Sequence, residues 1–292
     1  MSRIDATPSS ELIAATARRG MIVNEKSCLH VEVGSETDVG CVRDNNEDSY
    51  RVVPPLNLFV LSDGMGGQAH GEVASGTAVD VTVTYCLEAS DNGSILPDRQ
   101  LRPDLSEKTN CLVNAAQLAN RKVYDAALSD PTLRGMGATL IAAWLEDSRL
   151  SLVNVGDSRA YLLRSSMLTR LTTDHTLVGE QVRRGIVTPE QAEKSPLQNI
   201  LIRALGPHQE VEIDASEIPL LCQDIVLLCT DGLTHMVPDA EIADTLISNP
   251  SAQQAAGLLV ALAKQHGGED NVSVIVLRIV GDSAKSSYHP GA

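Results

Sequence analysis

Short apolar runs separated by polar turns predict most of the strands in this chain. The runs are rich in Val, Leu and Ile and are bounded by Gly, Pro, Asn or Asp, which is typical of β-strands. They cover residues 29–33, 49–53, 57–61, 138–146, 149–155, 160–164, 210–213, 224–229 and 272–280.

Apolar positions three and four residues apart predict the helices. Long helices are expected over 71–88 and 107–128, and shorter ones over 9–19, 238–247 and 252–265. The run from Val79 to Thr84 is β-branched and also suits a strand. Thr188-Pro189-Glu190-Gln191 has the pattern of a helix start, with Thr as the N-cap and Pro in the first position.

The order of these elements predicts an α+β fold. Strands come in two groups, each followed by a pair of helices, instead of alternating regularly with helices. We expect one domain over 29–280, interrupted by short helical pieces over 172–205. A flexible N-terminal extension is expected over 1–28 and a disordered tail over 281–292.

Composition narrows the class of protein. The net charge is −15 and aromatics make up 2% of the residues, which argues against a nucleic-acid partner because such binders use basic side chains and stacking platforms. There is no apolar stretch of membrane-spanning length, so no membrane association is expected. The six cysteines form no C-x-x-C pair. We therefore expect a cytoplasmic protein, and a monomer.

Acidic residues mark the ends of several predicted strands. Asp63-Gly64 follows one run, Thr230-Asp231-Gly232 follows another, and Glu269-Asp270-Asn271 precedes the last. Carboxylate oxygens are the ligands that Mg²⁺ and Mn²⁺ prefer, so the clusters predict a two-metal site that also includes Glu47 and Asp48. An isolated Asp-Gly pair is usually only a turn, and it is the joint occurrence that favours a metal site.

The chain resembles the metal-dependent serine/threonine protein phosphatases of type 2C, in their bacterial form. The resemblance extends from about residue 31 to residue 280. It rests on seven segments in order: Arg43-x-x-Asn46-Glu47-Asp48, Asp63-Gly64-Met65-Gly66-Gly67, Gly71-Glu72-Val73-Ala74-Ser75, Gly135-Met136-Gly137-Ala138-Thr139, Val155-Gly156-Asp157-Ser158-Arg159-Ala160-Tyr161, Cys229-Thr230-Asp231-Gly232-Leu233 and Glu269-Asp270-Asn271-Val272-Ser273. The resemblance implies a central sandwich of two antiparallel β-sheets flanked by helix pairs, with a flap at 172–205.

The resemblance also implies roles for individual residues. Asp63 would bridge two Mn²⁺ or Mg²⁺ ions, and the carbonyl of Gly64 would bind one of them. Glu47 would be an outer ligand of one ion, and Asp231 and Asp270 would be outer ligands of the other. Asp48 would hold a metal-bound water, and Arg43 would bind the substrate phosphate. Asp157, with Asp231, matches a possible third ion.

The implied activity is hydrolysis of phosphoserine and phosphothreonine in phosphoproteins by a metal-bridged hydroxide, with a cognate Ser/Thr kinase as the opposing enzyme. A phosphoprotein-binding pseudophosphatase and a small-metabolite phosphohydrolase are the alternatives. The proton donor for the leaving group is not assigned. His70 and His175 are candidates, since Met65 stands where eukaryotic relatives have His, and Gln68 where bacterial relatives often do.

Overall fold

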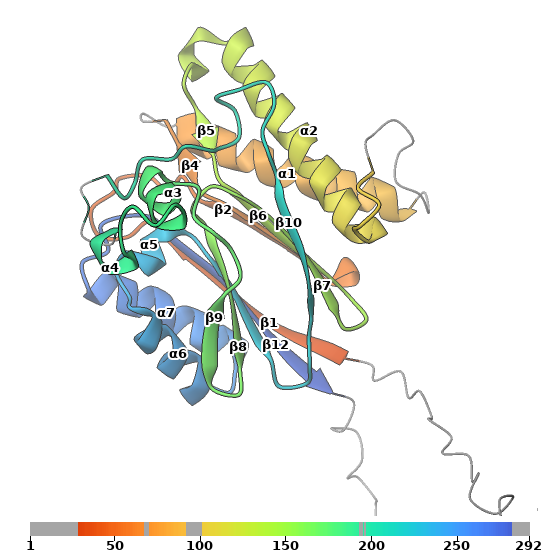
Figure 1. The fold of residues 1–292 in the computed structure, drawn as a ribbon, viewed down its shortest axis with the longest axis vertical. Coiled ribbons are helices and arrows are strands. Elements are labelled where there is room, and N and C mark those ends of the chain that lie inside the picture. The colour runs from red at the N-terminus through yellow and green to blue at the C-terminus, as the bar shows by residue number, and fades with distance from the viewer. Residues whose placement is uncertain (1–28, 67–69, 92–100, 193–194, 196, 282–292) are drawn as a thin grey trace, which may run out of the picture.

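A computed structural model describes residues 29–66, 70–91, 101–192, 195 and 197–281. Two five-stranded antiparallel sheets lie face to face, and helices cover both outer faces (Figure 1). The predicted α+β sandwich is confirmed. The helix predicted over 9–19, the extension 1–28 and all but the first residue of the tail lie outside the described residues.

The first sheet has the strand order β1-β12-β11-β8-β9, and the second has the order β10-β7-β6-β3-β2. A third, two-stranded sheet pairs β4 with β5. The strand bounds are β1 Leu29–Asp38, β2 Ser49–Val53, β3 Leu58–Ser62, β4 Gly64–Met65, β5 Gly137–Ala138, β6 Leu140–Glu146, β7 Arg149–Val155, β8 Arg159–Arg164, β9 Met167–Arg170, β10 Asp214–Pro219, β11 Ile225–Cys229 and β12 Val272–Gly281.

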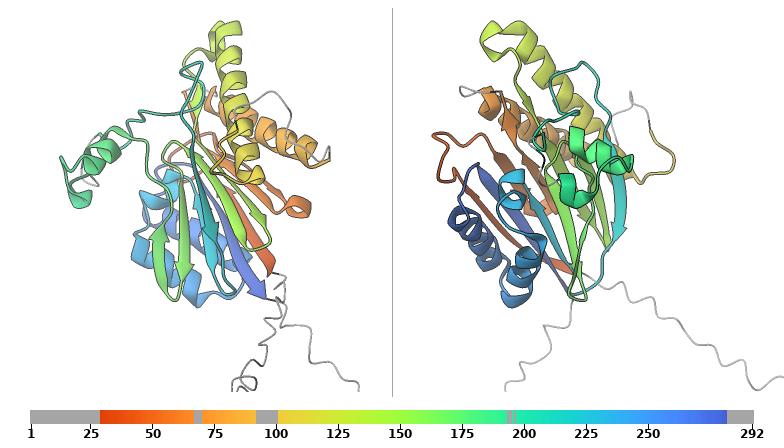
Figure 2. Two further views of the ribbon diagram at one scale, coloured as in Figure 1. Left: turned by 45° about the vertical axis from the view of Figure 1, so that its right-hand side comes forward. Right: turned by 60° about the vertical axis from the view of Figure 1, so that its left-hand side comes forward.

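Helices α1 (His70–Asp91) and α2 (Glu107–Ser129) cover the second sheet. Helices α5 (Asp231–Thr234), α6 (Asp239–Ser248) and α7 (Ala252–Gln265) cover the first. Two short helices, α3 (Leu177–Arg183) and α4 (Pro189–Ala192), project to one side of the sandwich (Figure 2). Within the described ranges, no helix is both long and apolar enough to cross a bilayer.

The buried side chains form three hydrophobic layers: one between the two sheets, and one between each sheet and its helices. In β3, Phe59 and Leu61 lie in the core between the sheets, while Leu58 and Val60 pack beneath α1 and α2. Successive side chains of a strand point to opposite faces, so a strand covered on both faces is mostly apolar. This explains why β3, β6 and β11 appear in the sequence as nearly continuous apolar runs.

Helix α1 forms despite its β-branched run. Val79 and Val83 are buried in the core formed with the second sheet, together with Ala78 and Cys86 of the same helix. Burial of this face outweighs the lower intrinsic helix propensity of Val and Thr, because most helical stability in proteins comes from tertiary packing.

The strand predicted over 210–213 is wrong. The strand in this region is β10, which pairs Asp214 with Asn154 and Pro219 with Arg149. Ile213 is buried and Val211 packs against the same core, which accounts for their apolar alternation outside any strand. The edge strand β10 has one neighbour and alternates little in burial, so its sequence lacks a clear strand pattern. Strand β9, also at an edge, was not predicted.

The predicted short helical pieces over 172–205 are confirmed as α3 and α4. Thr188 caps α4 as expected, since its backbone N–H donates to Gln191 Oε1 (2.9 Å) and Gln191 N–H donates to its hydroxyl (3.3 Å). The two ends of the segment meet, because Ile202 N–H donates to His175 O over 2.9 Å. We keep the name flap for residues 172–205.

Candidate metal centre

Strand register brings the predicted site residues to one end of the sandwich. Strand β2 begins at Ser49 opposite Ser62, the last residue of β3, so Glu47 and Asp48 lie beside Asp63 and Gly64. In the other sheet, Cys229 at the end of β11 pairs with Arg159 at the start of β8 and with Val274 near the start of β12. The same end therefore holds Asp157, Asp231 and Asp270.

Asp48 is buried, and its two carboxylate oxygens differ. Oδ2 accepts hydrogen bonds from Ser273 Oγ (2.6 Å) and Thr230 Oγ1 (3.0 Å). Oδ1 is buried without a hydrogen-bond partner. Burial and, to a lesser extent, the charges of Asp231 and Asp270 raise the pKa of Asp48 to about 7, although the two hydroxyl hydrogen bonds act to lower it. Such an orphaned buried oxygen suits a cation or a cation-held water.

Asp63 is positioned by its backbone. Its N–H donates to the hydroxyl of Thr139 over 2.9 Å, and its carbonyl accepts from Thr139 N–H over 2.8 Å. Burial raises its pKa well above the usual range, and the charges of Asp48, Asp231 and Asp157 add to the effect. These carboxylates therefore lie close enough together to repel one another.

Glu47 and Gly64 are fixed by close backbone packing. Gly64 N–H donates to Glu47 O over 3.1 Å, and Glu47 N–H donates to the side-chain carbonyl of Asn271 over 2.8 Å. The Glu47 carboxylate lies against Gly71 at the start of α1, where any Cβ would overlap it. A Cβ on Gly64 would overlap the carbonyl of Gly71. Both glycines are thus required by the approach of other groups.

The other predicted ligands lie at the same end of the sandwich, which we call the acidic end because it gathers Glu47, Asp48, Asp63, Asp157, Asp231 and Asp270. Asp157 is 8% exposed, and its pKa is raised well above its usual value, first by burial and then by Asp231. Asp231 has a buried Oδ1 without a hydrogen-bond partner, while its Oδ2 lies 3.4 Å from Nδ1 of His235. Arg43 donates to Asp270 Oδ2 over 2.8 Å, and this carboxylate raises the pKa of the guanidinium. The predicted phosphate clamp is therefore held beside a predicted ligand.

The donor chemistry fits a hard divalent cation. The acidic end combines mutually repelling carboxylates with two orphaned buried oxygens, and a cation between them would satisfy both. Among the residues that the structure describes, no three His, Cys, Asp or Glu side chains are arranged as a ready-made ligand set. Repulsion between the carboxylates keeps them from converging on one point. A bound divalent cation would replace this repulsion with attraction to its own charge.

Several residues that support the site were not singled out from the sequence. Thr139, Thr230, Asn271 and Ser273 each hold a predicted site residue, and each is at most 5% exposed. Asn271 also donates to the carbonyls of Val39 and Asn45, both over 2.9 Å, and so ties the loop before β2 to the start of β12. All four lie within the matching segments, which was the available signal.

A groove of about 750 Å³ opens beside the acidic end. Asp157 and Asp231 line it on the side of the acidic end, and the flap lines it on the other. Its walls combine apolar and basic side chains, including Val178, Val182, Met236, Val237, Arg170 and Arg183.

Comparison with known proteins identifies the family. The profile of the family described as Protein phosphatase 2C matches residues 42–266. The serine/threonine phosphatase Stp of Listeria welshimeri is 37% identical over 252 residues, which cover 85% of this chain and 95% of that protein. The serine/threonine protein phosphatase PstP of Mycobacterium tuberculosis is 38% identical over 86% of this chain and 46% of its own length.

Solved structures agree with the sequence relatives. A crystal structure of the Mycobacterium tuberculosis phosphatase PstP superposes with a TM-score of 0.74 at 36% identity, covering 86% of this chain and 99% of that one. A structure of the PstP catalytic domain in complex with two manganese ions gives a TM-score of 0.72 at 36% identity, with the same coverage of both chains. The chain belongs to the protein phosphatase 2C family.

Proposed function

We propose that this protein serine/threonine phosphatase removes phosphate from phosphoserine and phosphothreonine residues by direct attack of water at the acidic end of its sandwich. The phosphatase activity follows from family membership. The observation that supports the site is the set of three carboxylates, Asp48, Asp63 and Asp157, whose pKa values are raised by burial, with further contributions from neighbouring carboxylates. Uncompensated carboxylates gathered in this way are typical of functional sites.

The chain offers ligands for two Mn²⁺ or Mg²⁺ ions. Asp63 would be shared by both ions, and the carbonyl of Gly64 would bind one of them. Glu47 would complete one site, and Asp231 and Asp270 the other. Asp157, with Asp231, would hold a third ion. When bound, these ions would lower the pKa of a water molecule and neutralise charge on the phosphate.

The remaining roles fall to side chains of the chain itself. Arg43 presents a planar guanidinium at 56% side-chain exposure, suited to two phosphate oxygens. Asp48 keeps Oδ1 free of protein partners because Ser273 and Thr230 both bind Oδ2, so Oδ1 is available to orient the attacking water.

The groove beside the site favours a polypeptide substrate over a small metabolite. Its volume of about 750 Å³ and its apolar wall at Val178, Val182 and Val237 offer contacts to residues that flank a phosphorylated side chain. We propose a cognate Ser/Thr kinase as the source of these substrates. The five cysteines of the described ranges are free thiols, which supports a reducing, cytoplasmic location.

The test measures hydrolysis of p-nitrophenyl phosphate and of a phosphothreonine peptide with Mn²⁺, with Mg²⁺ and without metal. We expect metal-dependent activity that falls at least ~10²-fold in Asp63→Asn, because a shared ligand is lost. Asp80→Asn is the matched control, since Asp80 is exposed and pairs with Arg51 away from the site.

Full activity of Asp63→Asn would rule out the proposed centre. A competition assay of the phosphopeptide against nucleotides and sugar phosphates tests the substrate class. Preference for the small phosphates would contradict a polypeptide substrate, and phosphopeptide binding without turnover would indicate a pseudophosphatase.

A further inference from the structure

His175 holds both polar backbone atoms of one residue in the turn before β8. Gly156 N–H donates to His175 Nδ1 over 3.0 Å, and His175 N–H donates to Gly156 O over 3.0 Å. His175 is 5% exposed and lies between β9 and α3 in the sequence, near the start of the flap. A side chain from one segment thus clamps the turn that precedes Asp157.

The same hydrogen bonds determine the tautomer of the ring. Nδ1 accepts a hydrogen bond from Gly156 N–H, so the neutral ring carries its own proton on Nε2. Nε2 lies 3.1 Å from Asp214 Oδ2, which accepts its hydrogen bond. Arg203 Nη1 also lies 3.0 Å from Nε2, and it donates to Asp214 Oδ1. Burial lowers the pKa of His175, which favours this neutral form. Both ring nitrogens are therefore engaged, and the ring does not serve as the proton donor for a leaving group.

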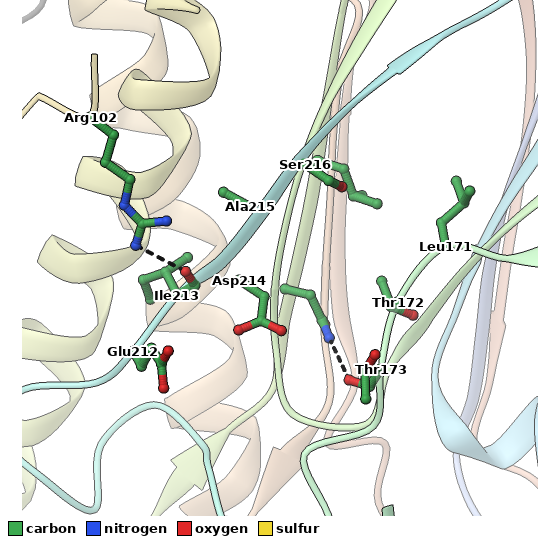
Figure 3. Close-up of a pocket in the computed structure, with 11 residues that line it drawn as sticks. Arg102, Leu171, Thr172, Thr173, Glu212, Ile213, Asp214, Ala215 and Ser216 are labelled. Carbon is green, nitrogen blue, oxygen red and sulfur yellow. Dashed lines mark hydrogen bonds between the residues drawn. The ribbon is translucent and has the colours of Figure 1, made fainter. Parts of the chain in front are cut away.

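Asp214 is braced in turn by the exit of the flap. Arg203 Nη1 lies 2.5 Å from Asp214 Oδ1, and Arg203 Nη2 lies 2.9 Å from Glu212 Oε2. Figure 3 shows Asp214 and Glu212 on the segment that enters β10, beside a cavity of about 320 Å³ with Thr172 and Thr173 on its opposite wall. The ring is thus oriented from the edge of the second sheet.

The turn that His175 clamps is pinned on its other side as well. Ser158 Oγ lies 2.7 Å from the hydroxyl of Thr139, the residue that also fixes the backbone of Asp63. Gly156 has φ +104°, and a Cβ there would lie 2.6 Å from Cγ2 of Thr139. Asp157 therefore sits between two anchors, one at Thr139 and one at His175.

We propose that His175 is a positioning residue that clamps Gly156 and thereby holds the Asp157 carboxylate where it can share a divalent cation with Asp231. The inference rests on the proposed role of Asp157 as a ligand. Groups that orient a ligand without touching the metal typically change its affinity by 10–100-fold. Loss of the clamp leaves Asp157 intact but no longer pre-organised.

The experiment titrates Mn²⁺ by calorimetry into the metal-free full chain, with and without Asp157→Asn. His175→Asn keeps an acceptor near the Nδ1 position, whereas His175→Gln places its amide near the Nε2 position. We expect His175→Ala and His175→Gln to weaken the Asp157-dependent Mn²⁺ site about 10-fold or more, and His175→Asn to stay within about 3-fold of wild type. In the Asp157→Asn background, none of the three should change Mn²⁺ binding further.

A second readout needs no metal. Hydrogen exchange at the Gly156 amide should accelerate in His175→Ala and His175→Gln, and stay close to wild type in His175→Asn. Asp214→Ala leaves the ring in place but removes the acceptor that selects its tautomer. It should weaken the same Mn²⁺ site in the same direction, and it replaces His175→Ala if that variant does not fold.

The inference is overturned if His175→Ala binds Mn²⁺ as wild type does, or if its loss is equally large without Asp157. An unchanged Gly156 exchange rate in a folded His175→Ala also overturns it. The proposed function has its own test, because full activity of Asp63→Asn would contradict it whatever the His175 variants show. Mn²⁺ binding that needs Asp157 but not His175 would overturn the clamp alone.

Discussion

The hydroxyl of Ser273 donates to Oδ2 of Asp48 over 2.6 Å, between residues 225 positions apart in the sequence. Thr230 Oγ1 donates to the same oxygen over 3.0 Å. Both bonds fall on Oδ2, so the carboxylate is anchored through one oxygen while the other stays free of protein partners. A buried acid with one anchored and one free oxygen can orient a water molecule without moving itself.

Ser273→Ala should lower kcat with Mn²⁺ by about 10-fold while leaving the fold intact. Loss of one hydrogen bond to a charged group costs about 1.5–3 kcal/mol, and the freed carboxylate gains alternative orientations. The measurement is steady-state hydrolysis of a phosphopeptide. Thr245→Ala is the matched control, since its hydroxyl also donates a bond, to Glu241 O over 2.8 Å, on the exposed face of α6. Equal activity of the two variants would contradict the role given to Asp48.

Arg43→Lys should raise KM for phosphopeptide about 10-fold, because an ammonium cannot match two phosphate oxygens as a guanidinium does. Stability should change by less than about 1 kcal/mol, as is usual for exposed ion pairs. Arg51→Lys is the control: Arg51 has the same 56% side-chain exposure and a comparable ion pair, 2.9 Å to Asp80. An unchanged KM in Arg43→Lys would remove this residue from the phosphate site.

Gly71→Ala should reduce Mn²⁺ affinity and activity, because the new Cβ overlaps the Glu47 carboxylate and displaces it. Gly76→Ala in the same helix is the control, since its Cβ would meet only Ser49 Oγ, at 3.9 Å. That substitution should leave Mn²⁺ binding unchanged and stabilise the protein by up to about 1 kcal/mol through helix propensity. Calorimetric Mn²⁺ titration and thermal unfolding distinguish the two. Wild-type Mn²⁺ affinity in Gly71→Ala would show that Glu47 is not a ligand.

Glu217→Gln should destabilise the protein at neutral pH and much less in acid. Hydrogen bonds from Ser106 and Thr109 lower the pKa of Glu217 to about 2, so the ionised form stabilises the native state. This contribution is complete above about pH 4.5 and disappears as the pH falls toward 2. We expect a loss of about 1–2 kcal/mol at pH 7 that shrinks at pH 3, measured by urea unfolding.

Glu146→Gln is the control for this experiment, because Glu146 is 60% exposed and lies 3.8 Å from Lys108. Its effect should stay within about 0.5 kcal/mol at both pH values. A loss in Glu217→Gln that is the same at pH 7 and pH 3 would show that the charge of Glu217 does not contribute.

Most of the fold was predictable because each central strand is marked by a local pattern. The apolar runs at β3, β6 and β11 are nearly continuous because both faces of these strands are buried. Edge strands lack this mark. Strand β10 was placed four residues too early because Val211 and Ile213 contact the core without pairing to another strand, and β9 was missed.

The sequence by itself determined which acidic residues stand at strand ends, and these are the carboxylates gathered at one end of the sandwich. It did not determine how they are held. Hydrogen bonds from Ser273 to Asp48, from Asp63 to Thr139 and from Gly156 to His175 join segments that are 19 to 225 residues apart. Such pairs leave no periodic signal, because they depend on register and distance in three dimensions. Only the tertiary structure shows that both ring nitrogens of His175 have hydrogen-bond partners, on Gly156 and Asp214.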